Sequence, residues 1–311
     1  MAQQFRSKNT KDINGILLLD KPLGISSNRA LQQVKNLFHA KKAGHTGNLD
    51  PLATGVLPIC FGEASKVTAF LLDSNKRYTC TAQLGKTTTT GDKEGDLLQT
   101  RSIDHQQLTN IESILEQFRG NIQQIPPMYS ALKHKGQPLY KLARQGLEIE
   151  RKARDVTIHE LNLINQTDDT ISLDVLCSKG TYIRTLAEDI GETLGCGAHL
   201  SLLRRTDVAP FDCSKLYKLE ELQALADNNQ LKDNDQFENI LLPIDSALIK
   251  HPKIILNNEE AKRIKNGLKV TRENIPKSDM IRLYLENNDF IGIGRYSSDQ
   301  QLAAKRLLKT N

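Results

Sequence analysis

The sequence has no tryptophan, and aromatic residues make up only 5% of its 311 residues. It contains no apolar run close to the roughly 20 residues that a membrane-spanning helix requires, because runs such as Ile16–Leu19 end at charged residues. The polar first 12 residues also lack the apolar core of a signal peptide. These absences predict a cytoplasmic protein that makes no contact with a membrane.

Cysteine pairs and several well-known enzyme motifs are absent as well. The five cysteines are an odd number without any C-x-x-C pair, which argues against a disulfide framework and against a zinc site. There is no P-loop, H-E-x-x-H or G-x-S-x-G motif, and Ser297 stands where a dinucleotide-binding motif starting at Gly292 needs its third glycine. These absences argue against metal-dependent hydrolysis, dinucleotide redox chemistry and α/β-hydrolase chemistry.

The charge of the chain is unevenly distributed. The net charge is only +5, but residues 133–154 hold seven Lys or Arg against two Glu, and residues 219–240 hold six Asp or Glu against one Lys. A basic face beside an acidic segment is typical of a protein that binds a polyanion. A solvated surface with uneven charge explains the same pattern, and charge alone favours this second explanation.

Apolar periodicity and turn residues predict interspersed strands and helices. The predicted strands are Gly15–Asp20, Arg77–Leu84 and a hairpin of Val156–Ile164 with Ile171–Cys177; the predicted helices start at Ser26 or Ser27, span Leu108–Phe118 up to Gly120, and span Thr181–Leu194. The order shows no strict βαβ alternation, so we predict an α+β fold with a mixed, largely antiparallel sheet flanked by helices.

Composition suggests two structural units. A polar tail over residues 1–13 precedes a main domain over residues 14–245, and residues 226–239 are polar enough to form a helix end and linker. Short apolar runs and glycines beyond this point predict a small β-rich domain over residues 250–311.

The most unusual segment is Gly44–Gly55, where three glycines and a proline indicate a bent loop of fixed shape. Asp50 comes directly before Pro51, a residue that disfavours helical backbone in its predecessor. From the residues alone, Asp50 is better explained as a helix N-cap, with Pro51 in the first helical position, than as a catalytic group. His45, which lies between Gly44 and Gly47, is likewise better explained as a loop residue that forms hydrogen bonds than as a base.

Several motifs in a fixed order resemble those of the TruB family of tRNA pseudouridine synthases. They are Leu18–Ser27, Gly44–Gly55, Lys76–Tyr78, Pro126–Ala131, Ser178–Arg184 and Leu203–Thr206. The resemblance is strong from Asn14 to Phe211 and weak beyond. Three positions depart from the family pattern, namely Ser26, Asn48 and Ala209, and none of them is a residue to which the resemblance gives a chemical role.

The resemblance implies the pseudouridine synthase fold and the isomerisation of uridine to pseudouridine at position 55 in the T loop of tRNA, without metal or cofactor. It gives the catalytic role to Asp50 and predicts that Arg184 pairs with it, so that the cation reverses the rise in pKa that burial causes. The alternative for Arg184 is a charge on a helix surface.

The resemblance also implies residues that bind the flipped-out base. Tyr78 matches a stacking tyrosine that can take part in the final proton removal, Tyr182 and Leu203 match residues of the uracil pocket, and His45 matches a residue that contacts the RNA. Tyr78 and Leu203 could instead be core residues. Lys21 is expected to organise a loop, with an ordinary surface lysine as the alternative.

The implied partner is the T-stem-loop of tRNA, without an obligatory protein partner. A basic insertion near residues 126–154 is expected to close on this RNA, and the domain over 250–311 resembles a PUA-like RNA-binding domain. Two other functions fit a related chain: a tRNA-folding chaperone, alone or in addition to catalysis, and a scaffold that acts with a guide RNA. The modest length and the lack of long Lys-rich tails argue against the scaffold.

Overall fold

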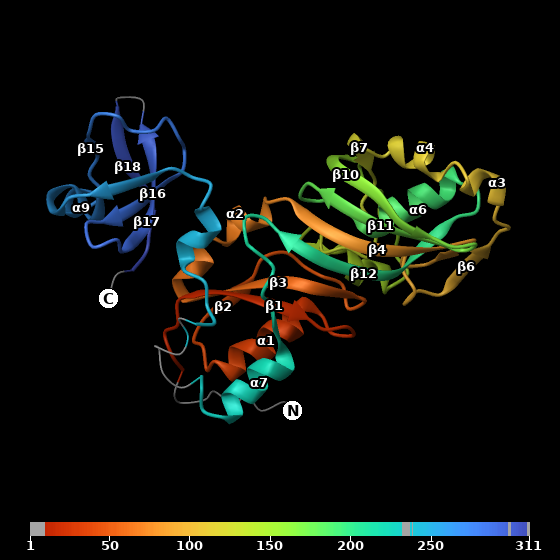
Figure 1. Ribbon diagram of the computed structural model, residues 1–311, viewed down its shortest axis with the longest axis horizontal. Helices are drawn as coiled ribbons and strands as arrows, with labels where there is room; N and C mark the ends of the chain where they lie inside the picture. Colours follow the sequence, from red (N-terminus) through yellow and green to blue (C-terminus); the bar gives the residue numbers. More distant parts are fainter. Residues whose placement is uncertain (1–9, 232–236, 238, 298–299, 310–311) are drawn as a thin grey trace.

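The computed structural model describes residues 10–231, 237, 239–297 and 300–309, and Figure 1 shows its two sheets side by side. The first nine residues, and residues 232–236 and 238 of the predicted linker, lie outside this description. Ordered structure begins before the predicted domain start, because Lys11 N donates to His39 O at 2.8 Å and Ile13 is buried.

The main sheet is mixed and largely antiparallel, as predicted. Its order is β13 (Tyr217–Lys218), β1 (Gly15–Lys21), β3 (Ala53–Phe61), β12 (Ala198–Val208), β4 (Lys76–Leu84), β11 (Thr170–Cys177), β10 (Arg154–Gln166) and β7 (Gly120–Gln124), with β2 (Ala43–His45) also paired to β3. Only β1–β13 and β3–β12 are parallel pairs. The parallel contact between β3 and β12 brings the segment after Gly44 next to Leu203–Arg205.

The central strands are buried on both faces, which is why they read as continuous apolar runs. In β1, Leu17 and Leu19 enter the larger core, whereas Ile16 and Leu18 enter a second core on the opposite face. The helices that pack on the main sheet and around it are α1 (Ser27–Leu37), α2 (Thr68–Leu72), α3 (His105–Leu108), α4 (Ile111–Glu116), α6 (Ile183–Thr193) and α7 (Leu219–Asp227). None of the helices in the described part of the chain is long and apolar enough to span a membrane.

Several local predictions are confirmed. Ser26 caps α1 by accepting a hydrogen bond from Arg29 N, strands β10 and β11 form the expected hairpin, and α6 lies within the predicted helix.

The predicted helix over Leu108–Phe118 is wrong as a single element, because the chain forms α3 and α4 with a break at Thr109 and Asn110. The Thr109 hydroxyl donates to Gln106 O at 2.6 Å. Threonine and asparagine side chains compete for backbone groups in this way and favour helix ends.

Smaller elements connect the large strands. They are η1 (Gly62–Lys66), the hairpin β5 (Lys86–Thr88) with β6 (Leu97–Thr100), the hairpin β8 (Lys133–His134) with β9 (Gln137–Pro138), α5 (Leu139–Ala143) and η2 (Ile244–Leu248). The predicted basic segment therefore consists of a short hairpin, α5 and the loop that leads into β10.

The C-terminal part forms a second, β-rich unit, as predicted. Its order is β14 (Lys253–Leu256), β16 (Ile281–Leu285), β17 (Phe290–Ser297), β18 (Gln301–Leu307) and β15 (Val270–Thr271), with α9 (Asn258–Lys265) packed against it. Ile293 of this sheet enters the second core of the main unit. Lys66 Nζ donates to Leu307 O at 2.7 Å, so η1 is tied to the C-terminal strand.

Candidate active site

The Gly44–Gly55 segment runs from the end of β2 across a loop into β3. Ala53 N donates to Asp50 O at 3.0 Å and β3 starts at Ala53, so a tight turn and a strand follow Asp50. No helix begins there in this described stretch, and the reading of Asp50 as a helix N-cap is wrong.

The turn before α1 holds this loop in place. The Ser27 hydroxyl accepts from Leu49 N at 2.7 Å and donates to Leu49 O at 3.0 Å. Gly24 N donates to Pro51 O at 2.8 Å. The backbone on both sides of Asp50 is therefore fixed by hydrogen bonds to residues 24–27.

Lys21 organises the same turn. Its side chain is fully buried, and its ammonium donates to Pro22 O and Ile25 O, both at 2.7 Å. Burial lowers the pKa of Lys21 to about 8, although the nearby carboxylates of Asp50 and Glu94 act to raise it. Lys21 is therefore not an ordinary surface lysine. It places a positive charge close to Asp50.

Arg184 lies at the start of α6 and pairs with Asp50, as predicted. The distance from Arg184 Nη2 to Asp50 Oδ2 is 3.0 Å. The arginine is only 5% exposed and also donates to Thr90 O and Tyr129 O, both at 2.7 Å. A charge on a helix surface does not describe it, because it joins three segments that are far apart in sequence.

A second carboxylate, which the sequence analysis missed, faces the same arginine. Asp92 Oδ2 lies 3.7 Å from Arg184 Nη1, and its side chain is 5% exposed. Asp92 is held by the loop between β5 and β6, where Glu94 N donates to Asp92 Oδ1 at 3.1 Å. Nothing in the run of Thr, Gly and Asp residues around it indicated that this carboxylate would turn inward.

The carboxylate of Asp50 is accessible although its surroundings are crowded. Its side chain is 41% exposed. Burial raises the pKa of Asp50 above its ordinary value, the charge of Arg184 opposes this, Asp92 adds to the rise and Lys21 opposes it. We expected the charge of Arg184 to outweigh the effect of burial on the pKa of Asp50. This expectation is wrong, because burial has the larger effect and the pKa is raised.

Tyr78 lies on β4 beside a buried arginine. Arg205 on β12 is directly opposite Tyr78 in the register of the two strands. Its side chain is 1% exposed and its Nε donates to Val56 O at 2.7 Å. Arg205 is therefore buried inside the sheet, although it belongs to a basic pair with Arg204 in the sequence. Arg204 forms a two-point ion pair with Asp20.

The other predicted residues surround this region. Tyr182 immediately precedes α6, and its backbone N–H donates to the Gln124 amide oxygen at 3.0 Å. Leu203 lies opposite Ala53 and belongs to the main core. His45 is half-buried at the end of β2, and burial together with the charge of Arg205 lowers its pKa.

Comparison with protein families identifies the chain. Residues 35–183 match the model "TruB family pseudouridylate synthase (N terminal domain)", residues 184–249 match "tRNA pseudouridylate synthase B C-terminal domain", and residues 252–308 match "Pseudouridine synthase II TruB, C-terminal". A tRNA pseudouridine synthase B of Pseudomonas fluorescens is 52% identical over 310 residues that cover 100% of both chains. The chain belongs to the TruB family. A relative of the same name from Yersinia pestis is 50% identical over 96% of this chain and 93% of its own length. As a TruB enzyme, the chain is an isomerase.

Solved structures support the TruB fold. The Cbf5 chain in a Cbf5-Nop10-Gar1 complex superposes with a TM-score of 0.70 and 25% identity, covering 95% of this chain and 84% of that one. A chain from an H/ACA RNP bound to a substrate RNA containing 2'-deoxyuridine also has a TM-score of 0.70, at 20% identity, over 100% of this chain and 94% of its own. The predicted pseudouridine synthase fold is confirmed.

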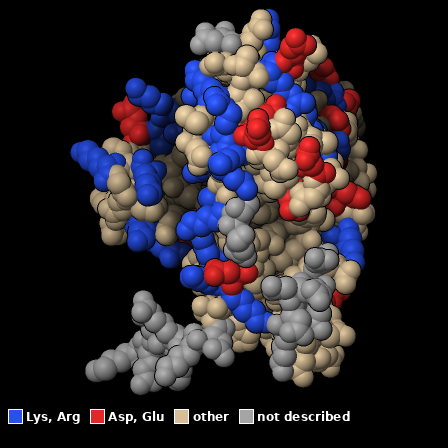
Figure 2. All heavy atoms as spheres, turned by 90° about the vertical axis from the view of Figure 1, so that its left-hand side faces the viewer, with Lys and Arg blue, Asp and Glu red and all other residues tan. Residues whose placement is uncertain are grey.

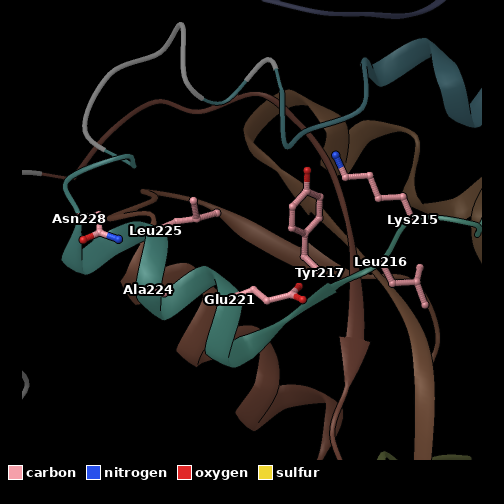
Figure 3. A pocket seen from close by; sticks show the side chains of 7 residues that line it. All are labelled: Lys215, Leu216, Tyr217, Glu221, Ala224, Leu225 and Asn228. Carbon is pink, nitrogen blue, oxygen red and sulfur yellow. The ribbon is translucent and has the colours of Figure 1, made fainter.

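A separate hollow beside α7 carries none of the TruB motifs (Figure 3). It is lined by residues 215–217 and by Glu221, Ala224, Leu225 and Asn228. The carboxylate of Glu221 already accepts a hydrogen bond from Lys218 N at 2.9 Å.

Within the described residues, no group of three or more His, Cys, Asp or Glu side chains is placed to hold a metal ion.

Proposed function

We propose that this enzyme converts a uridine of tRNA into pseudouridine at position 55 of the T loop, with Asp50 as the catalytic carboxylate. The observation that carries the proposal is the 3.0 Å ion pair between Arg184 and the accessible carboxylate of Asp50. It occurs in a chain that is 52% identical over its whole length to a tRNA pseudouridine synthase B.

The reaction needs one carboxylate and no outside reactant. The bond between C1′ of the ribose and N1 of the base breaks, the uracil rotates, and C5 bonds to the same C1′. The C5 proton then leaves, its electron pair restores the C5–C6 double bond, and N1 gains a proton. Asp50 can attack the ring or remove a proton from the sugar; both routes require its ionised form, which Arg184 and Lys21 favour.

The base must leave the RNA stack to reach Asp50. Unstacking costs a few kcal/mol, and an aromatic face returns about 1–3 kcal/mol per stacked base. The half-buried ring of Tyr78 is suited to this contact, and Tyr182 and Leu203 are suited to hold the edge and the far face of the uracil. The lowered pKa of His45 makes its imidazole a weaker base, so a contact to RNA fits His45 better than proton transfer.

The proposed RNA partner fits the charge of the surface. On the face that Figure 2 shows, Lys and Arg side chains gather in a band, with Asp and Glu mainly to one side. In the segment over residues 126–154, Lys133, Lys135, Lys141 and Arg144 are exposed. Phosphate contacts of this kind position an RNA, whereas unstacked bases specify it. We propose that this segment and the PUA-like C-terminal unit hold the tRNA.

Two further features complete the proposal. The five cysteines are all free thiols, which suits a cytoplasmic enzyme. A role as a tRNA-folding chaperone would need the binding surface alone, so it can coexist with catalysis and would survive the loss of Asp50. The proposed reaction is carried out without an obligatory protein partner.

Tritium release from a tRNA transcript that carries 5-tritiated uridine tests the proposal. The wild type should release tritium equivalent to one site per tRNA, and Asp50→Asn should release none while it still binds the tRNA. Asp96→Asn, an exposed carboxylate in a neighbouring loop, is the matched control and should behave like the wild type. If the wild type binds the tRNA but releases no tritium, the proposed enzymatic activity is contradicted. If Asp50→Asn releases tritium, the catalytic role of Asp50 is contradicted. Release from a site other than position 55 would contradict the T-loop assignment.

A further inference from the structure

Arg205 is a fully buried cation inside the candidate active site for which the chemistry above has no use. It lies opposite Tyr78 on β4 and opposite Gly55 on β3. A Cβ atom on Gly55 would come within 2.1 Å of Arg205 O, so only glycine permits this close contact of the strands. On the other side, a Cβ atom on Gly47 would lie 3.7 Å from Arg205 Nη1. The guanidinium thus lies between Tyr78 and the loop within Gly44–Gly55 that carries Asp50, which we call the catalytic loop.

One end of this guanidinium is unused. Nε is bonded to Val56 O, but among the described residues the buried Nη2 has no hydrogen-bond partner. Buried polar groups are nearly always paired, so an unpaired donor on a charged group needs an explanation. The contact to Val56 alone is enough to fasten the side chain to the sheet, and it leaves the second donor unexplained.

Directly opposite residues on neighbouring strands have Cβ atoms about 4.5–5.5 Å apart on the same face. Burial raises the pKa of the Tyr78 hydroxyl, and the charge of Arg205 is the largest influence that opposes this rise. The other ionisable groups that act on Tyr78 are Cys177 of β11 and Asp50 of the catalytic loop, and both raise its pKa. Arg205 also faces three basic groups, Lys21 of β1, His45 of β2 and Lys76 of β4, whose pKa values it lowers.

We propose that Arg205 is a positioning residue that acts through Tyr78: its guanidinium orients the Tyr78 hydroxyl and stabilises the phenolate, so that Tyr78 can accept the C5 proton in the last step. This inference rests on the proposed function. In that step the Tyr78 hydroxyl gives its own proton to N1, directly or through water. The C5–H bond breaks, the C5 proton passes to the phenolate oxygen, and the electron pair restores the C5–C6 double bond. Tyr78 ends the step as the hydroxyl it began with, so no other reactant is consumed.

A double-mutant cycle separates this role from a structural one. Single-turnover rates are measured for Tyr78→Phe, Arg205→Lys and the double variant. Loss of a positioned base typically costs about 10²-fold or more, and the double variant should be no slower than Tyr78→Phe. Arg204→Lys is the matched control, because Arg204 is the neighbouring arginine and pairs with Asp20. The rate reductions caused by Arg204→Lys and Tyr78→Phe should multiply when the two changes are combined. If the rate reductions of Arg205→Lys and Tyr78→Phe also multiply in the double variant, the proposal is overturned.

Isotope and pH measurements give a second readout. With tRNA that carries 5-deuterated uridine, Arg205→Gln should show a primary isotope effect larger than that of the wild type, because proton removal becomes slow. Its rate should also level off at higher pH, since loss of the cation raises the pKa of Tyr78. Arg205→Lys, which keeps the charge, should lie between the two. This shift should vanish in the Tyr78→Phe background, which excludes titration of Lys21 or Lys76 as its source.

These measurements distinguish a failure of the proposed function from a failure of the role proposed for Arg205. A wild type that forms no pseudouridine contradicts the proposed function, whereas an active wild type with equal isotope effects in all Arg205 variants contradicts only the role of Arg205. If Arg205→Lys does not fold, the proposal is also overturned, because the arginine is then required by its contact to Val56 rather than by Tyr78.

Discussion

The hydroxyl of Ser27 holds the backbone of Leu49 from both sides, by accepting from its N–H and donating to its carbonyl. Ser27 is 3% exposed and lies in the first turn of α1. Leu49 directly precedes Asp50, so this pair of bonds ties the position of the candidate catalytic carboxylate to a helix start.

Ser27→Ala should reduce turnover while tRNA affinity is retained. The change removes both hydrogen bonds and leaves two buried backbone groups unpaired, at a cost of about 1–3 kcal/mol. A small displacement of Asp50 is enough to lower the single-turnover rate by roughly 10-fold or more. Ser26→Ala is the control, since it removes only the helix cap and should cost about 1 kcal/mol of stability without lowering the rate. Equal rates for the two variants would contradict the positioning of Asp50 by Ser27.

Asp92→Asn should move the acid limb of the pH–rate profile to lower pH. Asp92 raises the pKa of Asp50 because two like charges share Arg184. Removing one charge makes Asp50 easier to ionise, and the ionised form is the active one, so activity persists at lower pH. The measurement is the single-turnover rate between about pH 4 and 7, with Asp96→Asn as the control. An acid limb that stays in place or moves to higher pH would show that the two carboxylates do not interact through Arg184.

Glu188→Gln should stabilise the protein at alkaline pH but not at pH 4. Burial raises the pKa of Glu188 to about 7, and its carboxylate packs directly against Gly91. Because the folded-state pKa lies above the unfolded value, stability present below pH 4.5 is lost as pH rises through 7 in the wild type. Above this range the glutamine variant should be more stable by about 1–3 kcal/mol.

Urea unfolding at several pH values measures this difference. The exposed Glu220 of α7 provides the control, since Glu220→Gln should change stability little at any pH. A stability gain of Glu188→Gln that does not depend on pH would mean that packing, rather than ionisation, makes Glu188 unfavourable.

The exposed lysines of the β8–β9 hairpin should contribute to RNA affinity through phosphate contacts. Replacing Lys133 and Lys135 together by Ala should weaken tRNA binding and flatten its salt dependence, by up to about 0.7–0.9 in log–log slope per lost contact. Filter binding between low and moderate salt measures both quantities. Lys218→Ala, next to the acidic helix α7, should leave the slope unchanged. An unchanged slope for the Lys133 and Lys135 variant would remove the hairpin from the RNA interface.

Local sequence determined much of this protein. The cap at Ser26, the strand at Gly15–Lys21 and the β10–β11 hairpin depend on neighbouring residues, and periodicity and turn chemistry predicted them. The order of the motifs was enough to give the family, and with it Asp50 and its pairing to Arg184. The helix break at Asn110 escaped prediction because apolar spacing outweighed the weaker preferences of two polar residues.

Tertiary structure alone decided which charged side chains became buried together. Asp92 lies in a polar loop and Arg205 lies in a basic pair of the sequence. The fold nevertheless buries Asp92 against Arg184, and it buries Arg205 between Tyr78 and the catalytic loop. Their burial depends on contacts between segments far apart in the chain. Desolvation, which raises the pKa of Asp50 despite its cationic neighbours, depends on all of those contacts at once, and for that reason no local pattern in the sequence could reveal it.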